Sequence, residues 1–143
     1  MSKYPYTAIP VLNGVCPART SLCLESPLGH GTFGVVYSAK NTRTNVLRAV
    51  KALKRTRRAV HEFRIHSKLR SHPGVVKLHA AYKWEQLLFL EMDLCSGGTL
   101  HEYMYRASYW RETALLKNHL FQLVDAVQFC HQQGVFHCDI KPQ

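Results

Sequence analysis

The stretch Gly29-His30-Gly31-Thr32-Phe33-Gly34-Val35-Val36 decides how the rest of the sequence is interpreted. Its glycines follow the order G-x-G-x-x-G-x-V, and such glycines let a backbone approach phosphate groups closely. The reason is that no Cβ intervenes and a positive φ is permitted. On its own the pattern fits equally well a tight turn between two strands that binds nothing.

The order of elements around these glycines excludes two common nucleotide-binding loops. A dinucleotide-binding fold runs strand, glycine loop, helix, and places an acidic residue further along for the ribose. Here residues 34–39 are expected to form a strand directly after the glycines, and no acidic residue stands at the ribose position. A Walker-type loop is excluded because no Gly-Lys-Ser or Gly-Lys-Thr ends the pattern. We therefore interpret the stretch as a hairpin flap over a nucleotide.

A lysine stands on the next predicted strand, at the end of Arg48-Ala49-Val50-Lys51. A lysine on a buried strand is costly unless its charge is paired or bound to an anion. From the residues alone two interpretations stay open: Lys51 extends to water from an edge strand, or it reaches phosphate oxygens behind the flap. Glu62 is the only acidic residue between Glu25 and Glu85. It is either a solvated helix residue or the ion-pair partner of Lys51.

Further outward, the sequence predicts one helix among strands and then only helices. The next predicted elements are a helix over 57–70 and strands over 75–78 and 87–92. The turn His72-Pro73-Gly74 ends the first helix. After Ser96-Gly97-Gly98, apolar residues recur at helical spacing as far as Gln133, and Gly134 is expected to end that helix. This order predicts an α+β fold with two layers or lobes.

Near the end of the chain, Val135-Phe136-His137-Cys138-Asp139-Ile140-Lys141-Pro142 places an acid and a lysine two residues apart. An aspartate in a tight loop that is flanked by core residues can accept a proton from a hydroxyl group. A lysine beside it can neutralise charge on a phosphoryl group during its transfer. Standing alone, the segment would also fit an ordinary turn that contains an aspartate.

Taken together and in this order, the glycine stretch, Lys51, Glu62 and the Asp139 segment resemble the signature set of protein kinases. The resemblance covers about residues 24–143, and residues 90–100 are similar to the family's hinge. It implies a protein-kinase-like two-lobed fold, in which an N-terminal antiparallel sheet with one helix precedes the first helices of an incomplete C-terminal lobe. The implied organisation is an N-terminal extension over 1–23 and a partial kinase domain over 24–143, divided into an N-lobe with hinge over 24–95 and the start of a C-lobe over 96–143.

This resemblance implies that the chain binds ATP. Lys51 would contact the α- and β-phosphates and pair with Glu62. Met92 would be the gatekeeper, and the carbonyl of Asp93 and the amide of Cys95 would bond the adenine. The residues implied in nucleotide binding are Leu28, Gly29, Gly31, Gly34, Val36, Ala49, Lys51, Glu62, Met92, Asp93 and Cys95.

The resemblance also implies the reaction. Asp139 would act as the catalytic base, and Lys141 would contact the γ-phosphate. Lys141-Pro142 is the serine/threonine form of this loop. The expected reaction therefore moves the γ-phosphoryl group of Mg-ATP to a hydroxyl group of a protein substrate. His137-Cys138-Asp139 is, in addition, similar to the sequence found in a fungal group of nutrient-signalling serine/threonine kinases.

Three positions depart from the family pattern. Cys138 stands where many kinases carry an arginine that grips a phosphorylated activation loop, which predicts a kinase that is not switched in this way. Only ten residues separate Lys51 from Glu62, so the intervening helix must begin almost at once. His66 falls where the family generally places an apolar residue.

The sequence reaches Gln143 without the asparagine or the Asp-Phe-Gly that bind magnesium in the family. Phosphoryl transfer depends on metal ions that neutralise developing charge, so we expect a fragment of a longer kinase that is inactive by itself. An apolar stripe of its last helix is expected to be left largely uncovered: Leu115, Leu116, Leu120, Val124 and Val127. The alternative prediction is a short non-catalytic module that binds a nucleotide, or a partner protein through that helix.

The composition narrows the class of protein. Apolar residues make up 46% and charged residues 20%, as in globular domains, and no apolar run approaches the roughly 18 residues that span a bilayer. The five cysteines form no C-x-x-C pair, which favours reduced thiols and a cytoplasmic or nuclear location. The net charge is +10, but the basic run at 54–58 lacks interleaved aromatic residues. A solvated surface is therefore favoured over nucleic-acid binding.

Overall fold

The computed structural model describes residues 21–31, 34–106 and 113–142 of the chain. The predicted N-terminal extension therefore lies outside the described residues up to position 20. Two residues of the glycine stretch, Thr32 and Phe33, and the final Gln143 also lie outside them.

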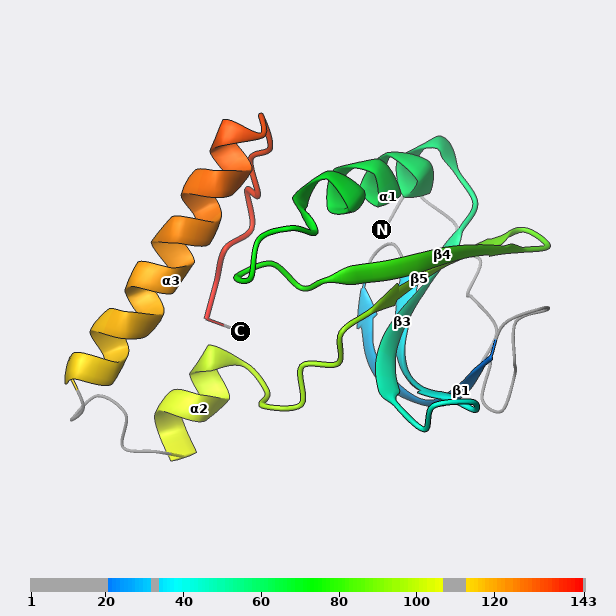
Figure 1. Ribbon diagram of the computed structural model, residues 1–143, viewed down its shortest axis with the longest axis horizontal. Coiled ribbons are helices and arrows are strands. Elements are labelled where there is room, and N and C mark those ends of the chain that lie inside the picture. The colour runs from blue at the N-terminus through cyan, green and yellow to red at the C-terminus, as the bar shows by residue number, and fades with distance from the viewer. Residues whose placement is uncertain (1–20, 32–33, 107–112, 143) are drawn as a thin grey trace, which may run out of the picture. The chain divides into compact units, whose positions relative to one another are not determined.

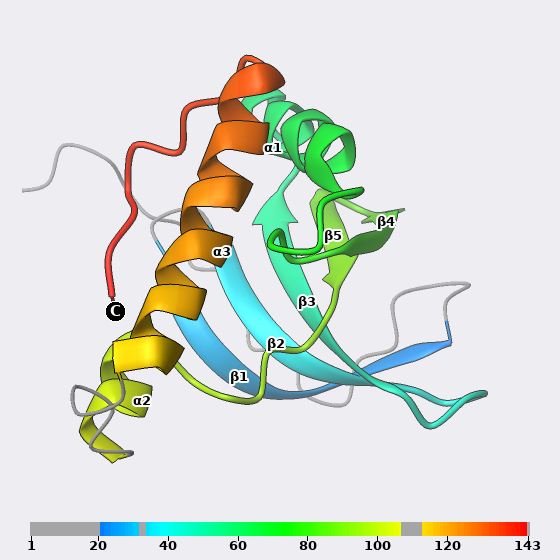
Figure 2. The same ribbon diagram turned by 60° about the vertical axis from the view of Figure 1, so that its left-hand side comes forward.

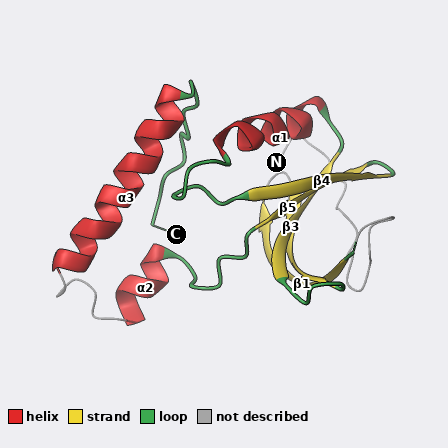
Figure 3. Cartoon of the chain, in the orientation of Figure 1, coloured by secondary structure: helices red, strands yellow, loops and turns green. Residues whose placement is uncertain are grey.

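The described residues form five strands and three helices (Figures 1 and 3). In chain order they are β1 (Leu22–Gly31), β2 (Gly34–Asn41), β3 (Leu47–Lys54), α1 (Arg57–Leu69), β4 (Leu78–Trp84), β5 (Leu87–Met92), α2 (Leu100–Arg106) and α3 (Thr113–Gln132). Strands with one inserted helix come first and helices follow, so the predicted α+β class is confirmed.

The strands form one antiparallel sheet in the order β1-β2-β3-β5-β4, whose curvature is visible in Figure 2. The glycine stretch joins β1 to β2 as a hairpin, and β5 has the predicted bounds. The predicted strand over 75–78 was wrong, because pairing begins only at Leu78. The backbone before it is still turning, since the amide of Val75 donates to the carbonyl of His72 at 3.1 Å. Apolar β-branched residues there gave a strand pattern without a partner strand.

The sheet buries a separate apolar cluster on each of its two faces, as the two-residue period of a strand requires. The first cluster consists of Leu22, Leu24, Val35, Tyr37, Ala39, Val50, Ala52 and Phe89. The second consists of Leu53, Ala59, Leu78, Leu88 and Leu90, with Phe63, Ala81 and Met92 packed against it. Because Ala59 and Phe63 lie on α1, this helix covers the second face.

The start of α1 is fixed by Thr56, whose Oγ1 accepts a hydrogen bond from the amide of Ala59 at 3.2 Å. This is the contact of a helix N-cap residue. The first turn contains Arg57 and Arg58 and no acidic residue, which is unfavourable at the positive end of a helix dipole. Burial of Ala59 and Phe63 against the sheet, rather than terminal charge, therefore holds this end of α1 in place.

The chain divides into two compact units. The first comprises the described residues up to Phe63 together with Leu78–Leu94, and so contains the sheet and the first half of α1. The second comprises Arg64–Lys77 and Cys95–Gln143, and contains α2, α3 and the stretch that follows α3.

Within the second unit, hydrogen bonds define the start of α2 and the end of α3. Before α2, the amide of Thr99 donates to Glu102 Oε2 at 2.8 Å, and the amide of Glu102 donates to Thr99 Oγ1 at 3.1 Å. These reciprocal bonds form a capping box. After α3, Gly134 has a φ of +71° and its amide donates to the carbonyl of His131, so it ends the helix as predicted.

Residues 135–142 have no regular secondary structure and run back alongside α3 (Figures 1 and 2). Between them lies a groove of about 450 Å³, lined by Leu123, Val124, Val127, Gln128, His131, Gln132 and Ile140. Of the stripe expected to be uncovered, Leu120 and Val124 are 47% and 62% exposed, whereas Leu115, Leu116 and Val127 are half-buried. None of the helices in the described ranges has the length and apolar character needed to cross a membrane.

Candidate active site

The strand register gathers several of the predicted nucleotide-binding residues on one face of the sheet. Val36 pairs with Lys51, and Lys51 with Leu90 on the next strand. Ala49 in turn pairs with Met92. Directly paired residues of neighbouring strands point to the same face, and so do residues two apart along a strand. Val36, Ala49, Lys51 and Met92 therefore share the face that carries the second apolar cluster.

On this face, Lys51 of β3 forms an ion pair with Glu62 of α1. Lys51 Nζ lies 2.5 Å from Glu62 Oε1, and the two side chains are 25% and 33% exposed. The ten residues between Lys51 and Glu62 are sufficient, because only two residues separate the end of β3 at Lys54 from the start of α1 at Arg57, and the second of them, Thr56, caps the helix. The lysine is thus held in place and still reaches solvent.

The three glycines of the flap differ in what surrounds them. A Cβ at Gly29 would meet nothing within 4 Å, and one at Gly31 would meet only the carbonyl oxygen of Gly34 at 3.8 Å. A Cβ at Gly34 would collide with the carbonyl oxygen of Ala52 and lie 2.8 Å from Leu53 Cδ2. Close packing of β2 on β3 therefore requires the third glycine, whatever it contributes to phosphate binding.

The remaining residues that the resemblance implies in nucleotide binding include Asp93, Cys95 and Leu28. Asp93 follows directly after β5, while Cys95 is exposed and belongs to the second unit. Leu28 lies in β1 and is 52% exposed, beside the register shift between Pro27 and Gly29. A ligand could cover such an exposed apolar side chain.

The predicted catalytic residues lie together in the second unit, in the stretch after α3. Lys141 Nζ lies 3.3 Å from Asp139 Oδ2, and the two side chains are 54% and 71% exposed. The amide of Asp139 donates to His137 Nδ1 at 3.2 Å, and Cys138 has a φ of +59°. Within this irregular stretch, called the Asp139 turn below after the positive φ of Cys138, Asp139 is exposed to solvent.

One expectation about this turn was wrong. Phe136 and Ile140 flank the aspartate and were expected to be core residues, but they are 69% and 51% exposed. Within the described residues, Phe136 contacts the ring of His131 at a centroid distance of 4.8 Å, and Ile140 lines the groove along α3. Among the described residues, no helix or strand buries either side chain.

Comparison with known proteins assigns these residues to a family. The family model described as protein kinase domain matches residues 23–143. The chain belongs to the protein kinase domain family. The match includes both the Lys51–Glu62 pair and the Asp139 turn.

The curated relatives of this kinase domain include serine/threonine kinases. A protein of Schizosaccharomyces pombe named negative regulator of sexual conjugation and meiosis is 33% identical over 131 residues, which are 86% of this chain and 28% of that protein. Serine/threonine-protein kinase PEPKR2 of Arabidopsis thaliana is 38% identical over 117 residues, 81% of this chain and 25% of that protein. An Aurora kinase of Schizosaccharomyces pombe is 31% identical over 128 residues, 84% and 36% respectively. The kinase domain chain thus spans about a quarter to a third of the length of these relatives.

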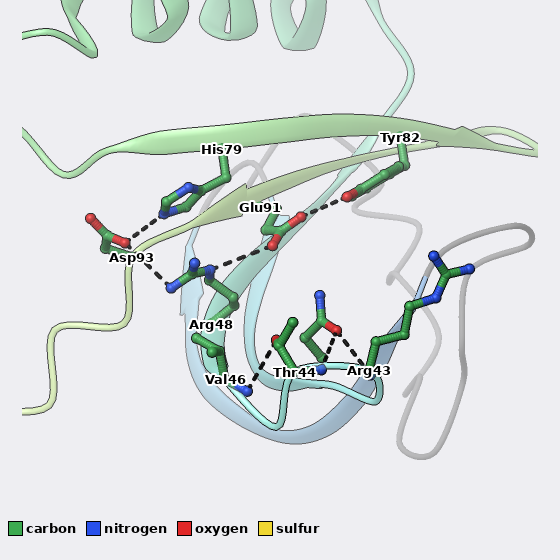
Figure 4. A network of polar contacts seen from close by, with 9 residues as sticks. Arg43, Thr44, Val46, Arg48, His79, Tyr82, Glu91 and Asp93 are labelled. Carbon is green, nitrogen blue, oxygen red and sulfur yellow. Dashed lines mark hydrogen bonds and ion pairs between the residues drawn. The ribbon is translucent and has the colours of Figure 1, made fainter.

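The structure also contains a polar network that the sequence analysis missed (Figure 4). Arg48 Nε lies 3.5 Å from Glu91 Oε1, and Arg48 Nη1 lies 3.6 Å from Asp93 Oδ1. His79 Nε2 donates to Asp93 Oδ1 at 2.6 Å, and Tyr82 donates its hydroxyl proton to Glu91 Oε2 at 2.6 Å. Burial, together with the hydrogen bond and charge of Glu91, raises the pKa of Tyr82 to about 12. No motif marks these residues, because strand pairing alone brings them together.

Two further features of the kinase domain are the position of His66 and the magnesium that the family implies. His66 does not act only as an apolar substitute: its Nε2 donates to the carbonyl of Val76 at 2.6 Å. Magnesium is implied by the family, but across the described ranges no group of three or more His, Cys, Asp or Glu side chains could hold a metal ion. The roles proposed below are those of protein side chains.

Proposed function

We propose that the whole protein is an ATP-dependent serine/threonine protein kinase and that this chain supplies its nucleotide-binding part. The observation that carries the proposal is the Lys51–Glu62 ion pair on the same sheet face as Val36, Ala49 and Met92. We propose residues 24–95 as the nucleotide-binding lobe and residues 96–143 as the start of the second lobe.

In this proposal Lys51 binds the α- and β-phosphates of ATP. Glu62 stabilises the position of the ammonium group, since a charge-assisted hydrogen bond is short and directional. The open surroundings of Gly29 and Gly31 leave room for phosphate oxygens to approach the backbone. The apolar side chains of Val36 and Ala49 would contact the adenine.

The proposed chemistry falls on the Asp139 turn. Asp139 is the base that orients the substrate hydroxyl group and accepts its proton, while the γ-phosphoryl group moves from ATP to that oxygen. Lys141 stabilises negative charge on the phosphoryl oxygens. The 3.3 Å Asp139–Lys141 ion pair keeps the two groups within reach of one reacting centre.

The test is binding of Mg-ATP to the intact chain by calorimetry, comparing wild type with Lys51→Met. We expect Lys51→Met to weaken ATP binding by about tenfold or more, because a partly desolvated charge-assisted contact to phosphate is lost. The matched control is Lys83→Met, since Lys83 is an exposed lysine on β4. Equal affinities of wild type and Lys51→Met, or no binding of ATP by wild type, would contradict the proposal.

A second candidate is a non-catalytic module that binds a nucleotide or a partner protein. It is favoured by the exposure of Asp139 and Lys141. Transfer of labelled γ-phosphate to a mixture of protein substrates distinguishes the two. Binding of ATP without transfer, unchanged by Asp139→Asn, would favour the module.

A further inference from the structure

The polypeptide leaves the sheet at the point where the proposed adenine contact begins. Met92 is the last paired residue of β5, with Ala49 of β3 on one side and Leu78 of β4 on the other. Asp93 comes next, directly after the last paired residue of both ladders. Its backbone carbonyl is the adenine acceptor that the resemblance to kinases implies, so the position of Asp93 bears directly on adenine binding.

The side chain of Asp93 contacts side chains of both β3 and β4. Asp93 Oδ1 accepts a hydrogen bond from His79 Nε2 of β4 at 2.6 Å and lies 3.6 Å from Arg48 Nη1 of β3 (Figure 4). Both neighbouring strands thus hold one carboxylate oxygen. The Asp93 side chain is 45% exposed, so apolar packing does not account for its position.

A local irregularity of β4 accompanies the position of His79. The register of β4 on β5 shifts between Leu78 and Ala80, which pair with Met92 and Glu91 respectively. His79 is the extra residue of this β-bulge, and it lies opposite no residue of β5 in the ladder. Bulges re-aim a side chain at the cost of one ladder position, and here the re-aimed side chain meets Asp93.

Arg48 is itself held by a buried acid. Its Nε lies 3.5 Å from Oε1 of Glu91, which is 7% exposed and whose other oxygen accepts the hydroxyl proton of Tyr82 at 2.6 Å. Burying a carboxylate is costly unless it is paired and hydrogen-bonded. A series of polar contacts therefore leads from Tyr82 through Glu91 and Arg48 to Asp93. Strand pairing, which uses backbone hydrogen bonds, does not require these side-chain contacts.

We infer that His79 and Arg48 are positioning residues for nucleotide binding: through the Asp93 carboxylate they orient the backbone that bonds the adenine base. The inference rests on the proposed function and adds how that function distinguishes an adenine nucleotide from other phosphate compounds. It assigns no chemical step to either residue. The alternative is that the network only stabilises the sheet edge.

Two probes separate these possibilities in the intact chain: ADP, which contains adenine, and inorganic tripolyphosphate, which does not. We expect His79→Leu to weaken ADP binding by about tenfold, the effect of one lost hydrogen bond to a charged group, and to leave tripolyphosphate binding unchanged. Asp93→Asn should act in the same direction, because it keeps the size of the side chain and removes its charge. His79→Gln retains a donor at similar reach and should restore most of the ADP affinity.

The chain offers a matched control in a second His–Asp pair. His72 Nε2 lies 3.1 Å from Asp125 Oδ2, and both residues belong to the second unit, whereas the two ladders that end at Met92 belong to the first. His72→Leu removes the same kind of contact and should leave the ratio of ADP to tripolyphosphate affinity unchanged. Thermal unfolding of each variant measures its effect on stability.

The outcomes distinguish this inference from the proposed function. If His79→Leu and Asp93→Asn lower the unfolding midpoint but leave the affinity ratio at the wild-type value, the network is only structural and the inference is overturned. If the wild-type chain binds tripolyphosphate and ADP equally, no adenine contact exists and the inference also fails. If wild type binds neither probe, the proposed function fails and the inference fails with it.

Discussion

Lys51 Nζ and Glu62 Oε1 lie 2.5 Å apart and join the central strand β3 to helix α1. Both side chains are about three-quarters to two-thirds buried, so the pair is only partly screened by solvent. Within the first unit, α1 otherwise contacts the sheet through the apolar residues Ala59 and Phe63. The ion pair therefore fixes the lysine rather than the helix.

The first prediction separates these two effects by a double-mutant cycle. Glu62→Gln should weaken ATP binding by about three- to tenfold, because the ammonium group loses its charged partner, and should change unfolding free energy by about 1 kcal/mol or less. In a Lys51→Met background the same change should have no further effect on affinity. Calorimetric titration with Mg-ATP and urea unfolding provide the two readouts.

Glu85→Gln is the control for this cycle, since Glu85 is an exposed acid of the same unit. Additive losses of affinity in the Lys51→Met, Glu62→Gln double variant would show that the two residues act independently.

The second prediction concerns the different surroundings of two flap glycines. Gly34→Ala should destabilise the fold by about 1–3 kcal/mol, because the new Cβ collides with the backbone of Ala52 and cannot be accommodated by a side-chain rotation. Gly29→Ala should stay within about 0.5 kcal/mol of wild type, since nothing lies within 4 Å of its Cβ. Urea unfolding measures both changes.

The same pair of variants also tests the flap. Gly29→Ala should lower ATP affinity without lowering stability, because its methyl group would occupy space open to the phosphates. A stable Gly29→Ala chain with wild-type affinity would exclude close backbone approach at this glycine.

Much of the first unit could be predicted because its signals are local. The glycine spacing and the single acidic residue between Glu25 and Glu85 lie within one short stretch of sequence, and the structure pairs that acid with Lys51. The boundaries of β5 were also correct, because its apolar run has clear limits. Local propensity and tertiary structure agree at these positions.

The remainder depended on long-range pairing. Val75 and Val76 have strand-forming side chains but pair with no described strand: the amide of Val75 donates to the carbonyl of His72, and the carbonyl of Val76 accepts a hydrogen bond from His66. His79 and Asp93 are fourteen residues apart and meet only because of a bulge in β4. A one-residue change of register reverses the face of every following side chain, and sequence periodicity does not reveal such a shift.

The third prediction follows from Tyr82, whose pKa burial and Glu91 raise from 10.0 to about 12. Between these values the native protein keeps a proton that the unfolded chain has released, so stability is complete below about pH 10 and falls as the pH rises toward 12. Tyr82→Phe removes this contribution, and the variant should lose less stability than wild type between pH 9 and pH 11. Urea unfolding at the two pH values measures the difference.

Tyr105→Phe is the matched control, because Tyr105 is 79% exposed. It should show the wild-type dependence on pH. At pH 9 Tyr82→Phe itself should be less stable than wild type by about 1–2 kcal/mol, since the buried Glu91 carboxylate loses a donor. Parallel stability curves for wild type and Tyr82→Phe would show that the Tyr82 proton is not retained in the native state.

The fourth prediction concerns the residue that ends α3 and leads into the Asp139 turn. Gly134 has a φ of +71°, and the adjacent amide of Val135 donates to the carbonyl of Cys130 at 2.9 Å. Nothing lies within 4 Å of a Cβ at Gly134, so alanine there meets no steric contact and pays only for the left-handed backbone. Gly134→Ala should therefore destabilise the second unit by about 1 kcal/mol, and Gly134→Asn by less, because asparagine tolerates this conformation better. Hydrogen exchange of the Val135 amide should accelerate in the alanine variant while amides of β3 and β5 keep their rates, and equal acceleration in both units would show that the effect is not confined to the end of this helix.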